Sequence, residues 1–233
     1  LALAELRVEH SHCLTPLSDI TLNVLIDQFL SAPTRSGSPR GPGSRYREQC
    51  RYQRHVQPGM GHRVADGINS HELTRLYDAL VARGLKATSV RLIHGLIRSA
   101  FTWGEKRGMV SSNPAKLAEC PTARTEPPHA PSMETVKAHL EILQEDPETA
   151  LAVRLAATIG LRRNEIAGLR WEHVDLDKGL VSITEGITVT PGQGASVTST
   201  KTGLHGHGVL SADEELVAML RDTSERLEKV AAD

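Results

Sequence analysis

The stretch TIGLRRNEIAGLRWEHVDLD, residues 158–177, places two adjacent arginines at a break between two helical runs. The run before the break has apolar residues at helical spacing: Leu151, Val153, Leu155 and Ile159. Gly160 predicts the end of that helix, because glycine tolerates the left-handed conformation common at helix C-termini. Arg162 and Arg163 then lie near the N-terminus of a second, shorter helix, where free N–H groups and the positive dipole end attract anions. The pattern therefore predicts an anion-binding turn.

Two alternatives accompany that prediction. An arginine at a helix start is more often an ordinary surface or capping charge, and spacing alone leaves open whether Arg162 or Arg163 faces the anion. Glu165 lies in the same turn and is expected to hold one of the two arginines through a charge-assisted hydrogen bond.

Length and composition narrow the class of protein. The chain has 233 residues, enough for one large domain or two modest ones. No apolar run approaches the roughly 20 residues that a membrane span needs. The opening LALAELRVEH is too short and too acidic for a secretory signal, and the three cysteines are too far apart for a disulfide framework. We therefore expect a cytoplasmic protein without a membrane partner.

Charge is distributed unevenly along the chain. Residues 19–120 carry 15 Lys+Arg against 8 Asp+Glu, a balance of +7. Residues 121–233 carry 11 against 18, a balance of −7. A basic first part is typical of a domain that binds a polyanion such as nucleic acid. The alternative is chance segregation of solvated surface charge.

The first part of the chain has helical periodicity between two breaks. The Pro/Gly/Ser-rich segment 31–43 is expected to be a loop, and the four prolines of 121–131 indicate a linker. Helices are predicted over 20–30, 44–57, 70–83 and 88–107. Thr88 is the expected N-cap of the last of these. Residues 19–120 are therefore predicted to form an all-α domain of about four helices.

The second part, 132–233, combines helices with strands. Helices are predicted over 132–145, 147–159, 163–170 and 211–230, the last capped by Ser211 with Glu214 at the capping-box position. The stretch LVSITEGITVT alternates as one strand, PGQG forms a turn, ASVTSTKT returns as its hairpin partner, and GHGVLS supplies a third short strand. The fold class is thus multidomain: an all-α domain followed by a mainly α domain with a small antiparallel β-sheet.

Two helix faces carry rows of basic residues. Arg47, Arg51 and Arg54 share one face of the 44–57 helix. Arg91, His94 and Arg98 share one face of the 88–107 helix. Guanidinium groups at helical spacing can follow a phosphate backbone, so both faces are candidate DNA contacts. Solvated faces without a ligand are the alternative.

A lysine and two histidine clusters complete the set of candidates. Lys201 lies in TSTKTG beyond the predicted turn, where a lysine is usually unremarkable but can reach over a phosphodiester as a proton donor. His205 and His207 form an H-x-H pair, and residues 10–13 read HSHC. Because neither cluster has a recognisable second pair of ligands, we expect no metal site.

Together these stretches resemble the tyrosine recombinase, or phage integrase, family. The segment 158–177 looks like the family's box Thr-Gly-Leu-Arg-x-x-Glu followed by Leu-x-Trp-x-Asp-Val-Asp. Its catalytic arginine maps onto Arg162, and Arg163 falls on a variable position. STKTG is similar to the family's lysine hairpin and maps the active-site lysine onto Lys201. Residues 19–120 resemble the core-binding (SAM-like) domain, which makes 132–233 an incomplete catalytic domain.

The resemblance implies a site-specific recombinase that grips double-stranded DNA and cuts it through a 3′-phosphotyrosyl link, with no metal or nucleotide cofactor. Arg162 would stabilise charge on the transition state, and Lys201 would protonate the leaving 5′-oxygen. A homotetramer on DNA is the implied assembly of the full-length protein, in a prokaryotic cytoplasm.

The chain departs from the family pattern at its end. The family's His-x-x-Arg box and nucleophilic tyrosine follow the last helix, whereas this sequence stops at Asp233 and its only tyrosines are Tyr46, Tyr52 and Tyr77. We therefore expect a C-terminally truncated fragment that is inactive by itself, with residues 1–18 as the remnant of an N-terminal region. The alternatives are a non-catalytic DNA-binding module from a decayed or frame-shifted integrase gene, or a helical protein–protein scaffold.

Overall fold

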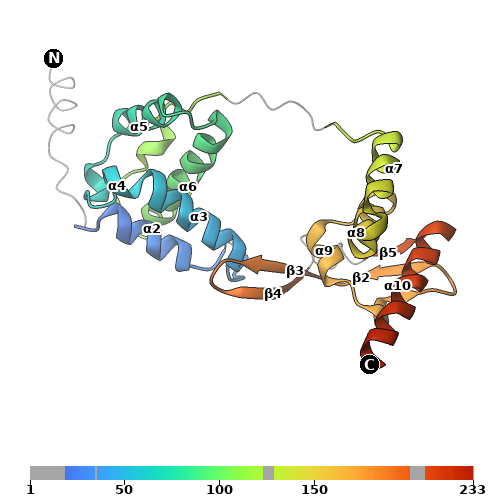
Figure 1. Ribbon diagram of the computed structural model, residues 1–233. Coiled ribbons are helices and arrows are strands. Elements are labelled where there is room, and N and C mark those ends of the chain that lie inside the picture. Colours follow the sequence, from blue (N-terminus) through green and yellow to red (C-terminus); the bar gives the residue numbers. More distant parts are fainter. Residues whose placement is uncertain (1–18, 35, 123–128, 200–207, 233) are drawn as a thin grey trace, which may run out of the picture. The chain divides into compact units, whose positions relative to one another are not determined.

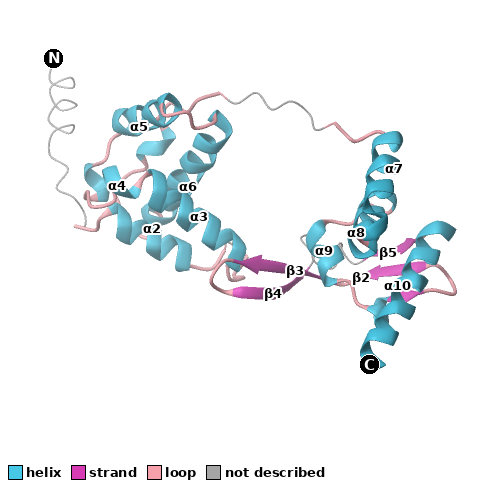
Figure 2. Cartoon of the chain, in the orientation of Figure 1, coloured by secondary structure: helices cyan, strands magenta, loops and turns pink. Residues whose placement is uncertain are grey.

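The computed structural model describes residues 19–34, 36–122, 129–199 and 208–232. The chain divides into two compact units, Leu1–Pro127 and Pro128–Asp233, here called unit 1 and unit 2. Figure 1 follows both units along the sequence, and Figure 2 shows that the described strands all belong to unit 2. This confirms the predicted fold class, a helical domain followed by a mainly helical one with small antiparallel sheets.

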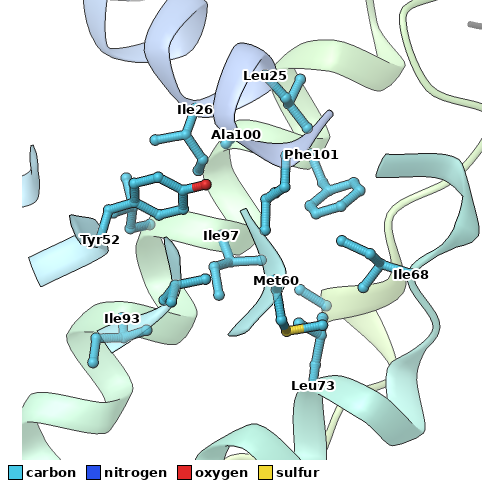
Figure 3. Close-up of a cluster of buried hydrophobic side chains, with 14 of the residues drawn as sticks. Leu25, Ile26, Tyr52, Met60, Ile68, Leu73, Ile93, Ile97, Ala100 and Phe101 are labelled. Atoms are coloured by element: carbon cyan, nitrogen blue, oxygen red, sulfur yellow. The ribbon is translucent and has the colours of Figure 1, made fainter. Parts of the chain in front are cut away.

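Unit 1 contains the four long helices that apolar spacing predicted. Its described elements are α2 (Leu22–Ser31), α3 (Pro42–His55), α4 (Gln57–Met60), η1 (Ala65–Gly67), α5 (Ser70–Ala82), α6 (Ala87–Glu105) and η2 (Pro114–Lys116). One side of α6 supplies much of the core, and α2, α3 and α5 pack against it. Figure 3 shows Leu25, Ile97 and Phe101 directed into this cluster, where each is fully or almost fully buried.

Local hydrogen bonds fix where the helices of unit 1 begin. Asn69 and Glu72 form a reciprocal capping box at the start of α5, with both bonds 3.0 Å long. The predicted N-cap Thr88 is wrong, because α6 already begins at Ala87, after the extended residue Lys86. Gly84, with φ of +88°, ends the preceding helix, and Leu85 and Lys86 then lead into α6.

Unit 2 packs helices against a small sheet. Its described elements are α7 (Met133–Ile142), η3 (Leu143–Glu145), α8 (Pro147–Thr158), α9 (Arg163–Gly168), η4 (Trp171–His173), β1 (Val174–Asp175), β2 (Leu180–Ile183), β3 (Glu185–Thr190), β4 (Gly194–Ser199), β5 (Gly208–Ser211) and α10 (Glu214–Ala232). The core is formed where α8 and α10 cover β2, with Leu155, Val181 and Leu216 buried.

The strands form two separate sheets, which corrects the sequence prediction. LVSITEGITVT was expected to be one strand, but the chain breaks at Thr184 and its two halves pair with different partners. Strand β2 lies between β1 and β5 in an antiparallel three-stranded sheet, whereas β3 pairs with β4 and with no other described strand. The predicted hairpin at PGQG is confirmed, with Gly192 and Gly194 at positive φ. Strand alternation encodes which faces are apolar, but not which neighbour each strand joins.

The last helix is capped by a different residue from the one predicted. Ser211 is the final residue of β5 and pairs with Leu180 of β2, so it cannot cap α10. Asp213 takes that role: its carboxylate accepts a hydrogen bond of 2.8 Å from the backbone N–H of Leu216. Aspartate and serine cap helices about equally well, so composition alone does not choose between them.

Candidate functional site

Gly160 creates the turn on which the candidate site is built. Helix α8 ends at Thr158, and Gly160 adopts a φ of +71°, as its predicted role requires. The next side chain, Leu161, is buried in the core of unit 2 and anchors the turn. Arg162 follows as the N-cap residue of α9, with an extended backbone. The turn thus fixes Arg162 between a buried leucine and a helix N-terminus.

Glu165 holds Arg162 at two points. One carboxylate oxygen, Oε1, accepts a hydrogen bond of 2.8 Å from Nη1 of the guanidinium. The other, Oε2, accepts a bond of 2.9 Å from the backbone N–H of the same arginine. The Glu165 side chain is only 6% exposed, whereas that of Arg162 is 60% exposed. A buried carboxylate therefore orients an arginine whose remaining donors are open to a ligand.

The electrostatics of Glu165 agree with this role. Burial by itself would raise the pKa of its carboxyl group. The backbone and side-chain hydrogen bonds from Arg162, together with the charge of the guanidinium, outweigh burial and lower the pKa. Glu165 is consequently ionised at neutral pH and forms a charge-assisted pair with Arg162.

Arg163 differs from its neighbour in its contacts. It is the first residue of α9 and is exposed. Within the described parts of the chain its guanidinium forms no ion pair or hydrogen bond. Of the two adjacent arginines, Glu165 therefore positions Arg162.

Sequence reasoning missed the contact that places α9. A Cβ atom on Gly168, the last residue of α9, would lie 2.7 Å from the Cα atom of Gly186 in β3. A Cβ atom on Gly186 would in turn lie 2.9 Å from the side chain of Asn164. Helix and strand therefore pack backbone against backbone. Two glycines 18 positions apart were the available signal, but nothing local identified them as partners.

Polar contacts reinforce the same junction. Nε of Arg170 donates a hydrogen bond of 2.6 Å to Oε1 of Glu185, and His173 lies 3.1 Å from the hydroxyl of Thr184. Ser199, the end of β4, pairs with Glu185 across the hairpin. The α9 end of the hairpin is therefore where β4 ends. Lys201 itself lies outside the described residues.

The predicted basic face of α3 has two exposed arginines and one half-buried one. Arg47 and Arg54 are exposed, and Arg51 between them is half-buried. Nη2 of Arg47 donates a hydrogen bond of 3.3 Å to the hydroxyl of Ser44. The face is thus available to a ligand over about two helical turns.

On α6, Arg91 and Arg98 are exposed, whereas His94 is half-buried. The His94 ring packs edge-on against Tyr77, with ring centroids 5.4 Å apart, and its Nδ1 lies 3.3 Å from the tyrosine hydroxyl. Burial, followed by the charges of Arg98 and Arg91, lowers the pKa of His94. The ring is therefore uncharged at neutral pH and packs on the core through Tyr77.

All three tyrosines of the chain lie in unit 1, where each side chain is buried or hydrogen-bonded. Tyr52 and Tyr77 are buried, and the hydroxyl of Tyr52 donates a hydrogen bond of 2.7 Å to Asn23. Burial raises the pKa of both phenols. A hydrogen bond with Cys50 is the main factor that raises the pKa of Tyr46. None of these environments activates a phenol as a nucleophile.

The described residues contain no group of three or more His, Cys, Asp or Glu side chains suited to a metal ion. His205, His207 and residues 10–13 lie outside the described part. None of the described helices combines the length and the apolar character needed to cross a membrane.

Part of the chain is similar in sequence to known proteins. No family model matches the chain. A tyrosine recombinase XerC of Xylella fastidiosa (strain M23) is 33% identical over 131 residues, which are 54% of this chain and 44% of that protein. An integrase of Saccharopolyspora erythraea is 26% identical over 149 residues, or 61% of this chain and 34% of the relative. The chain is therefore similar in sequence to tyrosine recombinases and integrases, as its motifs indicated.

Solved structures of integrases share the fold. The Tn1549 transposon integrase in complex with a circular intermediate DNA matches with a TM-score of 0.74 and 15% identity, covering 88% of this chain and 65% of that one. A lambda integrase tetramer bound to a Holliday junction matches with a TM-score of 0.63 and 16% identity, covering 96% and 64%. At such identity the likeness shows the fold alone. The chain spans less than half of the XerC relative that it matches.

Proposed function

We propose that this chain binds duplex DNA and forms part of a site-specific recombinase that breaks and rejoins strands through a 3′-phosphotyrosyl intermediate. The observation that carries the proposal is the pairing of exposed Arg162 with buried Glu165 at the Gly-Leu-Arg turn. A guanidinium held in advance costs little reorganisation when charge develops on a phosphate. Its planar fork of donors suits the phosphoryl oxygens.

The proposal gives each candidate residue a role. Arg162 stabilises charge on the phosphorane-like transition state, and Glu165 orients it. Lys201 protonates the leaving 5′-oxygen, which is supported by the position of Ser199 at the α9 end of the hairpin. The arginines of α3 and α6 contact the phosphate backbone, and His94 supports those of α6. No tyrosine of this chain is assigned as the nucleophile.

The first test is binding of the chain to duplex DNA over a range of salt concentrations. Counterion release predicts that the logarithm of the affinity falls linearly with the logarithm of the salt concentration, by about 0.9 for each phosphate neutralised. Affinity that does not depend on salt would exclude a phosphate interface and leave a protein–protein role.

A second candidate function is a DNA-binding module that occupies recombination sites without cutting them. The buried or hydrogen-bonded state of all three tyrosines favours it for this chain in isolation. Incubation with nicked duplex DNA, followed by a denaturing gel, separates the candidates. We expect bound DNA but no covalent protein–DNA species, and an adduct at Tyr46, Tyr52 or Tyr77 would overturn the assignment of Arg162 and Lys201 as the active site.

Assembly is part of the proposal. A lambda integrase forms a tetramer on a Holliday junction, and we propose the same assembly for the recombinase that contains these two units. Light scattering of that recombinase with a synthetic four-way junction should show four protomers for each junction. A persistent monomer on the junction would contradict this part of the proposal.

A further inference from the structure

Helix α6 buries one side and exposes the other. The buried side includes Val90, Ile93, Ile97 and Phe101. The outward side presents Thr88, Arg91, Leu92, Gly95, Arg98 and Ser99, all of them exposed. These six residues are here called the outer face of α6. They recur every three or four positions, as one stripe of a helix does.

The outer face has two chemically different edges. Successive residues are rotated by about 100°, so Arg91 and Arg98 lie along one edge, and Leu92 and Ser99 along the other. Neither guanidinium forms an ion pair or hydrogen bond with another described residue. Gly95 lies between the edges, and a Cβ atom built on it would meet nothing within 4 Å. The centre of the face is thus flat and lets another molecule approach the backbone.

Leu92 has no role in the core. Its exposed fraction is 53%, whereas Leu96 one turn further along is 5% exposed. Between residues 86 and 104 the sequence contains no Asp or Glu, so the leucine belongs to a face that is positive and apolar. Phosphate contact explains the arginines of such a face. It does not explain the leucine, because phosphate oxygens offer no apolar contact.

The major groove of DNA accounts for both edges. It is wide enough for an α-helix, and each thymine displays there a 5-methyl group that apolar side chains contact, while guanine displays two acceptors that suit arginine. We infer that Leu92 contacts the 5-methyl group of a thymine in the major groove and so selects that base. This inference rests on the proposed function, namely that the chain binds duplex DNA.

Helix geometry restricts where the selected bases lie. Arg91 and Arg98 are seven residues apart, which corresponds to a rise of about 10.5 Å. Base pairs are stacked about 3.4 Å apart, so the face covers about three to four of them. The thymine selected by Leu92 therefore lies within about four base pairs of any guanine that depends on Arg91 or Arg98.

The test begins with selection of sites from a randomised duplex library by the full chain, by Leu92→Ala and by Leu117→Ala. Leu117 is 82% exposed and lies outside α6, so it is the matched control. The selected duplex is then made with deoxyuridine in place of each thymine in turn, which removes only the methyl group. At one position we expect wild type to lose about fourfold in affinity, the usual effect of burying one methyl group.

Loss of the Leu92 side chain and loss of the thymine methyl group should not have additive effects on affinity. Leu92→Ala should bind the thymine and uracil duplexes equally, while Leu117→Ala should retain the fourfold discrimination. Thermal unfolding identical to wild type would show that the exposed substitution leaves unit 1 folded. If the chain binds DNA but Leu92→Ala still discriminates against uracil like wild type, this inference is wrong and the proposed function stands. No binding to any duplex would overturn both.

Discussion

Gly168 and Gly186 bring the backbones of α9 and β3 into direct contact, since a Cβ atom on the first would lie 2.7 Å from the Cα atom of the second. Helix α9 carries Arg162 at its N-cap, and β3 is the first strand of the hairpin that leads towards Lys201. One close backbone contact therefore joins the helix that begins after Arg162 to the hairpin that precedes Lys201 in the sequence. Interior packing of this density transmits a small displacement instead of absorbing it.

Gly168→Ala should destabilise unit 2 by about 1–3 kcal/mol, the usual cost of forcing an extra carbon into a packed interior. The measurement is urea unfolding followed by fluorescence of Trp171 in a Trp103→Phe background, because the chain has only these two tryptophans. Gly208→Ala is the control, since a Cβ atom there meets nothing within 4 Å. Equal midpoints for the two variants would mean that α9 and β3 are not in close contact.

Arg162→Ala should reduce strand cleavage by the recombinase that contains these units by roughly a hundred- to a thousandfold, the usual cost of one transition-state donor. DNA affinity should change little, because binding is spread over many phosphate contacts. Arg163→Ala is the matched control and should cost far less, because no side chain in the described residues orients it. If Arg163→Ala alone abolished cleavage, the roles of the two residues would be reversed.

Glu165 should make the stability of unit 2 depend on pH. Its folded-state pKa is lowered below the unfolded value of about 4.3, so its contribution is present above that pH and is lost as pH falls through the folded pKa. Glu165→Gln should therefore be less stable than wild type at neutral pH, and the difference should shrink on acidification. Urea unfolding across this pH range measures it. A stability difference that did not change with pH would exclude the ionised pair of Glu165 with Arg162 as its source.

Replacing Arg47, Arg51 and Arg54 together by alanine should weaken DNA binding by unit 1. The salt dependence should also flatten, by about 0.9 for each phosphate that the variant no longer neutralises. A triple alanine variant of α10 with the same decrease in positive charge, at Arg221, Arg226 and Lys229, tests whether net charge alone is responsible. Fluorescence anisotropy with labelled duplex gives both slopes, and identical slopes would remove the α3 face from the interface.

The capping of α10 by Asp213 and the ion pair of Asp213 with Arg154 can be measured separately. Asp213→Ala should cost about 0.5–2 kcal/mol of stability through loss of the cap. Asp213→Asn keeps a capping oxygen but loses the 2.9 Å pair with Arg154, so it should lie between the alanine variant and wild type. Ser211→Ala should stay within about 0.5 kcal/mol of wild type. A larger loss at Ser211 than at Asp213 in urea unfolding would restore the serine as the cap.

Features encoded within a few residues were predictable from the sequence. Apolar spacing alone located the helices of unit 1, because one helical face must be buried wherever the chain packs. The positive φ of Gly160 and the turn at PGQG were predictable, because both depend on the backbone preferences of the residues concerned. The family resemblance singled out Arg162 before any geometry was known.

Tertiary structure decided everything that depends on residues distant in the sequence. It separated β2 from β3 into different sheets, brought Gly168 against Gly186, and placed His94 on Tyr77. Glu165 also pairs with Arg162 and not with the adjacent Arg163 because the packing around α9 buries its carboxylate at that place. The sequence by itself determined where the long helices and the hairpin turn form and which residue types they carry. Which elements pack or pair with one another is set only when the chain folds around a common core. The pairing energies depend on neighbours that no local pattern specifies.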